Sequence, residues 1–182
     1  MMFTNPSDAV IKEILGRPLT IAVVICSDDP SRDSYRIAGR LKEFGFHMIP
    51  VNPFATSKQL HGEYCYASLA EIPAKVDMVD VFRRPALVDP IVDEAIACGA
   101  EILWMQLGVV NEAAARRAQE AGLTVVMDRC TSRDYRRFSN ARRATKPRNH
   151  PAIPGGFSST SMRPATNPLS NGMCRKPIIS GS

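Results

Sequence analysis

The chain has 182 residues, of which 45% are hydrophobic, and carries a formal net charge of +5. This length supports one domain with a substantial buried core. The chain shows no signal-like leader and no membrane-length apolar run, so we expect a cytoplasmic protein that does not contact a membrane. The five cysteines are scattered and never spaced C-x-x-C, which argues against a disulfide framework or a zinc site.

The positive charge belongs to the C-terminal end. From Ser139 onward there are seven Lys and Arg, six prolines and no acidic residue, whereas residues 1–138 hold 16 basic and 18 acidic residues. The tail has too little apolar periodicity to bury a core, so we predict that residues 139–182 are disordered. A basic tail can contact nucleic acid, but a solvated extension is the favoured interpretation.

Strand-like and helix-like patterns alternate ahead of this tail. A short helix is expected first, with Ser7 as its cap and its end near Gly16. Five buried strands are then expected at Leu19–Ile25, His47–Val51, Val76–Phe82, Glu101–Gln106 and Leu123–Met127. Helices are expected after the strands, except in the irregular stretch 52–73, ending at Gly45, Gly99, Gly122 and Phe138.

Repeated strand–helix units enforce parallel pairing with right-handed crossovers. We therefore predict an α/β domain over residues 1–138, with an open, doubly wound, five-stranded parallel sheet in the order 3-2-1-4-5. In such a sheet the ligand lies beyond the carboxyl ends of the strands, where the strand order reverses. For the predicted order this crevice lies between strands one and four.

The turn after the first strand reads CSDDPSRDSY, from Cys26 to Tyr35, and contains no glycine. A dinucleotide fingerprint needs three glycines here. The second strand ends in Asn52-Pro53, where a nicotinamide enzyme would present an acid to the ribose. Both features speak against a nicotinamide cofactor, although an NAD(P)-dependent oxidoreductase remains an alternative on the same fold.

Four segments between Lys12 and Phe138 form a recognisable pattern: VNP, LAEIPAKVDMVDVFRRP, EAIACGAEILWMQLGVVNEAAARRAQEAGLTVVMDRC and RRF. In these segments the chain closely resembles the small stand-alone CoA-binding domain proteins. That family is similar to the N-terminal domain of the succinyl-CoA synthetase α subunit. The resemblance implies a Rossmann-like fold that binds coenzyme A or an acyl-CoA. Ile25 stands where the family usually has glycine, and Cys26 where it usually has a Leu-like residue.

The first turn offers several ligand contacts. Ser27, Ser31 and Ser34 can donate hydroxyls to phosphate or can simply cap the following helix. Arg32 lies in the first helical turn, where a cation is unfavourable unless an anion is bound. Cys26 could be a reactive thiol at the helix N-terminus, but a buried packing role is favoured.

Arginines follow the third strand directly. Arg83 and Arg84 suit the 3′-phosphate of CoA through the bidentate guanidinium fork, the alternative being a solvated pair at the rim. Phe82 could stack on adenine or belong to the core. Gln106 and Gly108 fit a pantetheine or pyrophosphate contact, or a plain strand-to-helix turn.

These observations together predict a non-catalytic CoA-binding module that serves as a sensor, carrier or partner subunit. The residues predicted to contact the ligand are Cys26, Ser27, Ser31, Arg32, Ser34, Tyr35, Asn52, Pro53, Phe82, Arg83, Arg84, Gln106 and Gly108. No nucleophile elbow, P-loop or metal-binding spacing is present. A protein partner or a homo-oligomer is compatible with the sequence, and a nucleic-acid adaptor acting through the basic tail is the third alternative.

Overall fold

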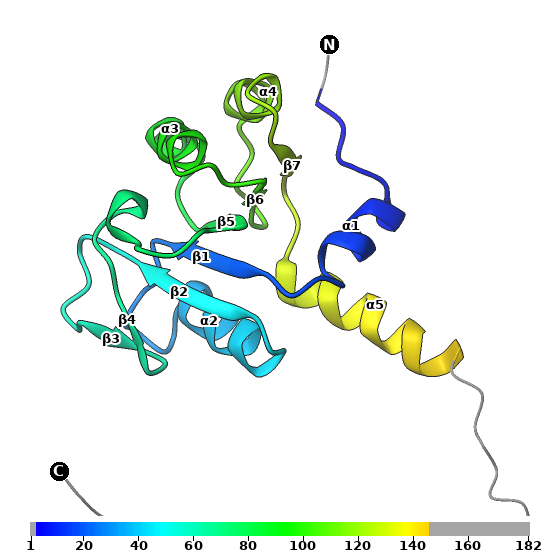
Figure 1. The fold of residues 1–182 in the computed structure, drawn as a ribbon, viewed down its shortest axis with the longest axis horizontal. Helices are drawn as coiled ribbons and strands as arrows, with labels where there is room; N and C mark the ends of the chain where they lie inside the picture. Colours follow the sequence, from blue (N-terminus) through cyan, green and yellow to red (C-terminus); the bar gives the residue numbers. More distant parts are fainter. Residues whose placement is uncertain (1–2, 146–182) are drawn as a thin grey trace, which may run out of the picture. The chain divides into compact units, whose positions relative to one another are not determined.

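A computed structural model describes residues 3–145 of the chain. The domain is built on five parallel strands (Figure 1), which are β1 (Thr20–Val24), β2 (His47–Val51), β5 (Met78–Val81), β6 (Ile102–Met105) and β7 (Thr124–Val126). The helices are α1 (Asp8–Ile14), α2 (Asp33–Glu43), α3 (Asp89–Ala97), α4 (Glu112–Glu120) and α5 (Thr131–Thr145). The predicted α/β class and its parallel five-stranded sheet are confirmed.

Helices cover both faces of the sheet. Alternate residues of a strand point to opposite faces, so Ile21 and Val23 of β1 pack on the side of α1, α2 and α5. Ala22 and Val24 pack on the other side, against α3 and α4. Figure 1 shows α3 and α4 together on one side of the strands and α2 and α5 on the other. Two apolar cores therefore sandwich the sheet, as expected of a doubly wound fold.

The predicted strand order is wrong at one position. The observed order is β2-β1-β5-β6-β7, so the third long strand lies between the first and the fourth and not at the edge beside the second. The reason lies in Pro50 of β2, which has no N–H to donate and is therefore restricted to an edge strand. On the outer side of β2 the N–H of Tyr66 donates to the Pro50 carbonyl.

This correction moves the reversal of strand order. Its position is between β1 and β5, not between the first and fourth strands as predicted. The segment Phe82–Pro85 follows β5, so it moves from a neighbouring position to the centre of the carboxyl edge.

The stretch expected to be irregular contains a small hairpin, formed by β3 (Gln59–Leu60) and β4 (Glu63–Tyr64). His61 at its tip stacks on Tyr35 of α2 with ring centroids 4.1 Å apart, and its Nε2 donates to the Tyr35 carbonyl at 2.8 Å. Lys42 of α2 donates to the His61 carbonyl and pairs with Glu63. These contacts hold the hairpin against α2.

The last helix is longer than predicted. Helix α5 continues to Thr145, past Phe138 and into the segment assigned to the tail. Tyr135 and Phe138 pack against the core on the α1 and α2 side, which gives this helix a buried face. The rest of the predicted disordered tail, from residue 146, lies outside the described residues. No helix in the range 3–145 is long and apolar enough to cross a membrane.

We expect Gly39→Ala to destabilise the domain because the new Cβ would lie 2.9 Å from Cε1 of His61. Displacing the His61 ring, which Tyr35 holds in place, should cost about 1–3 kcal/mol. This exceeds the ~1 kcal/mol that alanine gains over glycine in a helix. Urea unfolding of four proteins measures this: wild type, Gly39→Ala, His61→Ala and the double variant. In the His61→Ala background Gly39→Ala should become stabilising, and destabilisation there as well would contradict the proposed clash.

Candidate functional site

A cleft of about 630 Å³ opens at the carboxyl edge of the sheet, between α2 and α5. The ends of β5 and β6 form its floor. Residues from four segments line it: Asp33, Arg36, Ile37, Arg40, Phe82, Arg83, Arg84, Pro85, Gln106, Leu107, Gly108, Val109, Cys130 and Arg133. We call this the arginine cleft. Five of the predicted contact residues, those from Phe82–Arg84 and the pair Gln106 and Gly108, line it together.

The arginine cleft is strongly cationic. Five arginines line it against one acid, Asp33, which pairs with Arg36. Among the described residues no carboxylate pairs with Arg40, Arg84 or Arg133. Arg83 lies over the ring of Phe54, with its guanidinium carbon 5.7 Å from the ring centroid. Unneutralised guanidinium groups around a concave surface favour a ligand with several negative charges.

Three of these arginines, Arg36, Arg40 and Arg133, were not among the predicted contact residues. Arg36 and Arg40 stand one turn apart on α2, a spacing that places both on one helical face. Arg133 lies in the first turn of α5. The i, i+4 spacing was visible in the sequence, but the side of the sheet that α2 covers was not, so nothing assigned these residues to the same cleft as Arg83.

The turn after β1 is used mainly for internal contacts. The N–H of Ser27 donates to Oγ of the buried Ser34 at 3.0 Å, and Oγ of Ser27 accepts from the N–H of Asp29. The Cys26 side chain is fully buried, and this burial raises the pKa of its thiol to about 12, with smaller contributions from Cys65 and nearby acids. This geometry supports the packing role for Cys26 and removes the basis for a reactive thiolate.

Ile25 has a left-handed backbone conformation, with φ of 62°. Such a conformation is a genuine outlier for a β-branched residue and costs about 1–2 kcal/mol. Its N–H donates to the Val51 carbonyl at 2.8 Å, and the N–H of Cys26 points to the same oxygen. The chain therefore makes this turn with a β-branched residue and bears the backbone strain that such a residue brings.

Other predicted contact residues lie outside the arginine cleft. The Asn52 amide donates to the Cys26 carbonyl at 2.9 Å and accepts from the N–H of Phe54, so it braces the ends of β1 and β2, and Pro53 beside it is exposed. Arg32 is exposed and lies 3.7 Å from Asp29, whose carboxylate also accepts from the N–H of Ser31.

Tyr35 lines a separate depression on the outer face of α2, beside His61. Ligand contacts by Tyr35 and by the residues of the first turn stay predictions.

A buried polar cluster lies beneath the arginine cleft. Gln106 donates through Nε2 to Asp80 of β5 at 2.8 Å and to Oγ1 of Thr131, the first residue of α5, at 2.7 Å. The Thr131 hydroxyl donates to the same Asp80 carboxylate at 3.2 Å. Burial raises the pKa of Asp80 to about 7, against the opposing effect of these two hydrogen bonds.

Gly108 shapes the rim of the cleft. It has a φ of 78°, and its N–H donates to the carboxylate of Asp128 at 2.7 Å. The loop after β6 is thereby tied to the end of β7, and the N–H of Gly108 is occupied by a protein acceptor.

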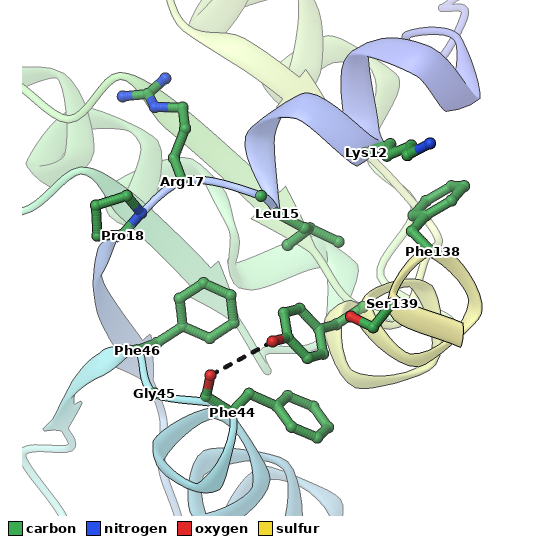
Figure 2. Close-up of a pocket in the computed structure, with 11 residues that line it drawn as sticks. Lys12, Leu15, Arg17, Pro18, Phe44, Gly45, Phe46, Phe138 and Ser139 are labelled. Atoms are coloured by element: carbon green, nitrogen blue, oxygen red, sulfur yellow. Dashed lines mark hydrogen bonds between the residues drawn. The ribbon is translucent and has the colours of Figure 1, made fainter. Parts of the chain in front are cut away.

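A second, smaller cavity of about 220 Å³ lies near the opposite edge of the sheet, where α1, α2 and α5 meet (Figure 2). Tyr135 stacks on Phe44 with ring centroids 4.3 Å apart and approaches Phe46 edge-on. Its hydroxyl donates to the Phe44 carbonyl at 3.4 Å. None of the predicted contact residues lines this cavity, which separates it from the arginine cleft.

Comparisons with known proteins identify the family. The sequence model of the CoA binding domain matches residues 19–136. The chain belongs to the CoA binding domain family. It is 42% identical over 126 residues to the uncharacterized protein YneT of Bacillus subtilis, which covers 69% of this chain and 92% of YneT.

Solved structures share this fold. A hypothetical protein from Pyrococcus horikoshii matches with a TM-score of 0.70 and 38% identity, over 76% of this chain and 99% of the other. A dinucleotide-forming acetyl-coenzyme A synthetase from Ca. Korarchaeum cryptofilum matches with a TM-score of 0.56 and 28% identity, over 64% of this chain. This chain covers only 27% of that synthetase, so the likeness concerns one part of a larger enzyme.

The contribution of Asp80 to the free energy of unfolding should fall as the pH rises from about 4 to 7. The unfolded chain releases the Asp80 proton near pH 4, whereas the folded protein keeps it until about pH 7. Between these two pH values the folded protein binds one proton more than the unfolded chain. The stability that this proton provides is lost as the Asp80 carboxyl ionises. Asp80→Asn should flatten this dependence, measured by urea unfolding at pH 5 and pH 8. An unchanged slope would contradict the assignment.

Proposed function

We propose that this protein binds coenzyme A or an acyl-CoA in the arginine cleft, without catalysing a reaction, as a sensor, carrier or partner subunit. The observation that carries the proposal is the convergence of five arginines on one cleft at the carboxyl edge of a CoA binding domain. Parallel α/β sheets bind their ligands at this edge, beside the reversal of strand order.

The charge of the cleft fits the charge of CoA. The ligand carries a pyrophosphate and a 3′-phosphate, and guanidinium groups bind phosphate oxygens through two parallel hydrogen bonds. Arg83 and Arg84 follow β5 directly, while Arg36 and Arg40 face them from α2. Arginines on opposite walls can engage phosphates at different points along an extended ligand.

A nicotinamide cofactor suits the site less well. Asn52 occupies the end of β2, where a ribose-binding acid would stand, and both ends of its amide are engaged by main-chain groups. This favours CoA over an NAD(P)-dependent oxidoreductase. The nucleic-acid alternative depended on the basic tail, most of which lies outside the described residues.

CoA should raise the melting temperature of the full chain, and NAD or NADP should not. At a hundredfold excess over its dissociation constant, CoA should stabilise the folded state by about 2.7 kcal/mol. Thermal unfolding with CoA, acetyl-CoA, NAD and NADP at equal concentrations measures the difference. A shift with NAD or NADP and none with CoA would overturn the proposal.

Replacing Arg83 and Arg84 together by alanine should weaken CoA much more than dephospho-CoA. Loss of a charge-assisted contact to the 3′-phosphate is worth roughly 1.5–3 kcal/mol, and dephospho-CoA lacks that group. Calorimetric titration of both ligands measures the change.

A matched control is the double variant Arg116→Ala/Arg117→Ala on α4, which removes the same charge from the opposite face of the sheet. It should leave both affinities near the wild-type values. Equal weakening of CoA and dephospho-CoA by the Arg83/Arg84 variant would place the 3′-phosphate elsewhere in the protein.

A further inference from the structure

The side-chain amide of Gln106 lies at the floor of the arginine cleft, and its nitrogen has hydrogen-bond partners while its oxygen has none among the described residues. Gln106 is only 3% exposed, and its Nε2 atom donates one hydrogen toward Asp80 and the other to Oγ1 of Thr131. Both hydrogens of the amide nitrogen are thereby engaged. The amide oxygen accepts from none of the donors in the described part of the chain.

This oxygen is open to the cleft. No buried side-chain nitrogen or oxygen among the described residues lacks a partner, so an amide oxygen without a donor must be reached by solvent. Gln106 lines the arginine cleft, and its nitrogen points away from it, toward Asp80 and Thr131. The oxygen is consequently the polar group that Gln106 offers to a ligand.

The neighbours of the carboxamide fix its orientation. Above about pH 7 Asp80 is ionised and can only accept hydrogen bonds, so there the nitrogen of Gln106 faces it and the oxygen does not. Thr131 accepts from the second hydrogen while its own hydroxyl donates to Asp80, which closes a triangle of three mutually bonded side chains. Asp80 lies in β5, Thr131 begins α5 and Gln106 directly follows β6, so packing of these elements holds the triangle in place.

We propose that Asp80 and Thr131 position Gln106 as a fixed hydrogen-bond acceptor for an amide N–H of the pantetheine arm of CoA. The inference rests on the proposed function and names the part of the ligand that this floor receives. Asp80 and Thr131 act through Gln106 and are positioning residues.

The surroundings of the oxygen favour the pantetheine arm over a phosphate. A carbonyl oxygen repels phosphate oxygens, and the apolar side chains of Phe82, Leu107 and Val109 line the same cleft. The arginines that line it are the groups suited to phosphates. A neutral chain with amide N–H groups matches apolar lining that holds one acceptor. The nucleotide half of CoA carries other donors, the adenine amino group and the ribose hydroxyl, and the experiment separates that half from the pantetheine arm.

The test compares CoA with adenosine 3′,5′-bisphosphate, which has the adenine and two phosphates but no pantetheine. Affinities are measured by calorimetry at pH 8.5, above the pKa of about 7 for Asp80. Thr131→Val removes the hydroxyl at nearly constant volume and leaves Asp80 as the one side chain that holds the carboxamide among the described residues. We expect it to weaken CoA about 5- to 20-fold and to leave the bisphosphate within twofold of wild type.

Thr131→Ser is the matched control because it restores the hydroxyl, and it should recover most of the CoA affinity. Gln106→Met, which keeps the length of the side chain and removes the acceptor, should reproduce the selective loss. Asp80→Asn should do so too, since its amide can donate to the oxygen of Gln106 and draw it from the cleft. These two variants keep the test decisive if Thr131→Val does not fold.

The outcomes separate the two proposals. If the variants weaken CoA and the bisphosphate equally, the donor lies in the nucleotide half or the cluster is merely structural, and the inference is overturned while CoA binding stands. If wild-type protein binds neither ligand, the proposed function fails and the inference with it. A selective loss for CoA that Thr131→Ser reverses supports the positioning role.

Discussion

The pairing of β1 with both β2 and β5 is the constraint on which the rest of this structure depends. The two crossovers that leave β1 and β2 run to opposite sides of β1, so the order of the strands reverses between β1 and β5. At such a reversal the connecting segments diverge and leave a hollow at the carboxyl edge. The arginine cleft lies at this edge, beside the reversal, and the segment after β5 brings Arg83 and Arg84 into it.

Charge and burial divide the polar groups of this edge into two sets. Arginines stand on the walls, where water and a polyanionic ligand can reach them, and the described residues supply few acids to neutralise them. Asp80, Gln106 and Thr131 lie beneath, where their hydrogen bonds to one another offset the cost of burial. The same edge of the sheet therefore presents positive charge above and a fixed network of neutral and acidic groups below.

Local sequence patterns predicted much of the fold because strand burial, helix capping and helix ends depend mainly on residues that are close in the sequence. Continuous apolar strands, the Ser7 cap and the alternation of strands with helices all reappear in the structure. Pro50 also carried the signal of an edge strand, and the order 3-2-1-4-5 overlooked it. The hairpin at His61 had no comparable signal, since its two-residue strands depend on docking against α2 rather than on their own pattern.

The sequence by itself determined the class of fold, the family, and the presence of Arg83, Arg84, Gln106 and Gly108 at strand ends. Only the tertiary structure decided which of these side chains meet, because that depends on strand order and on the face that each helix covers. It added Arg36, Arg40 and Arg133 to the cleft and placed Cys26 and Ser34 in the interior. It also turned Asp80 from an isolated strand residue into the partner of Gln106, since hydrogen bonds between residues 26 positions apart form only when the sheet brings them together.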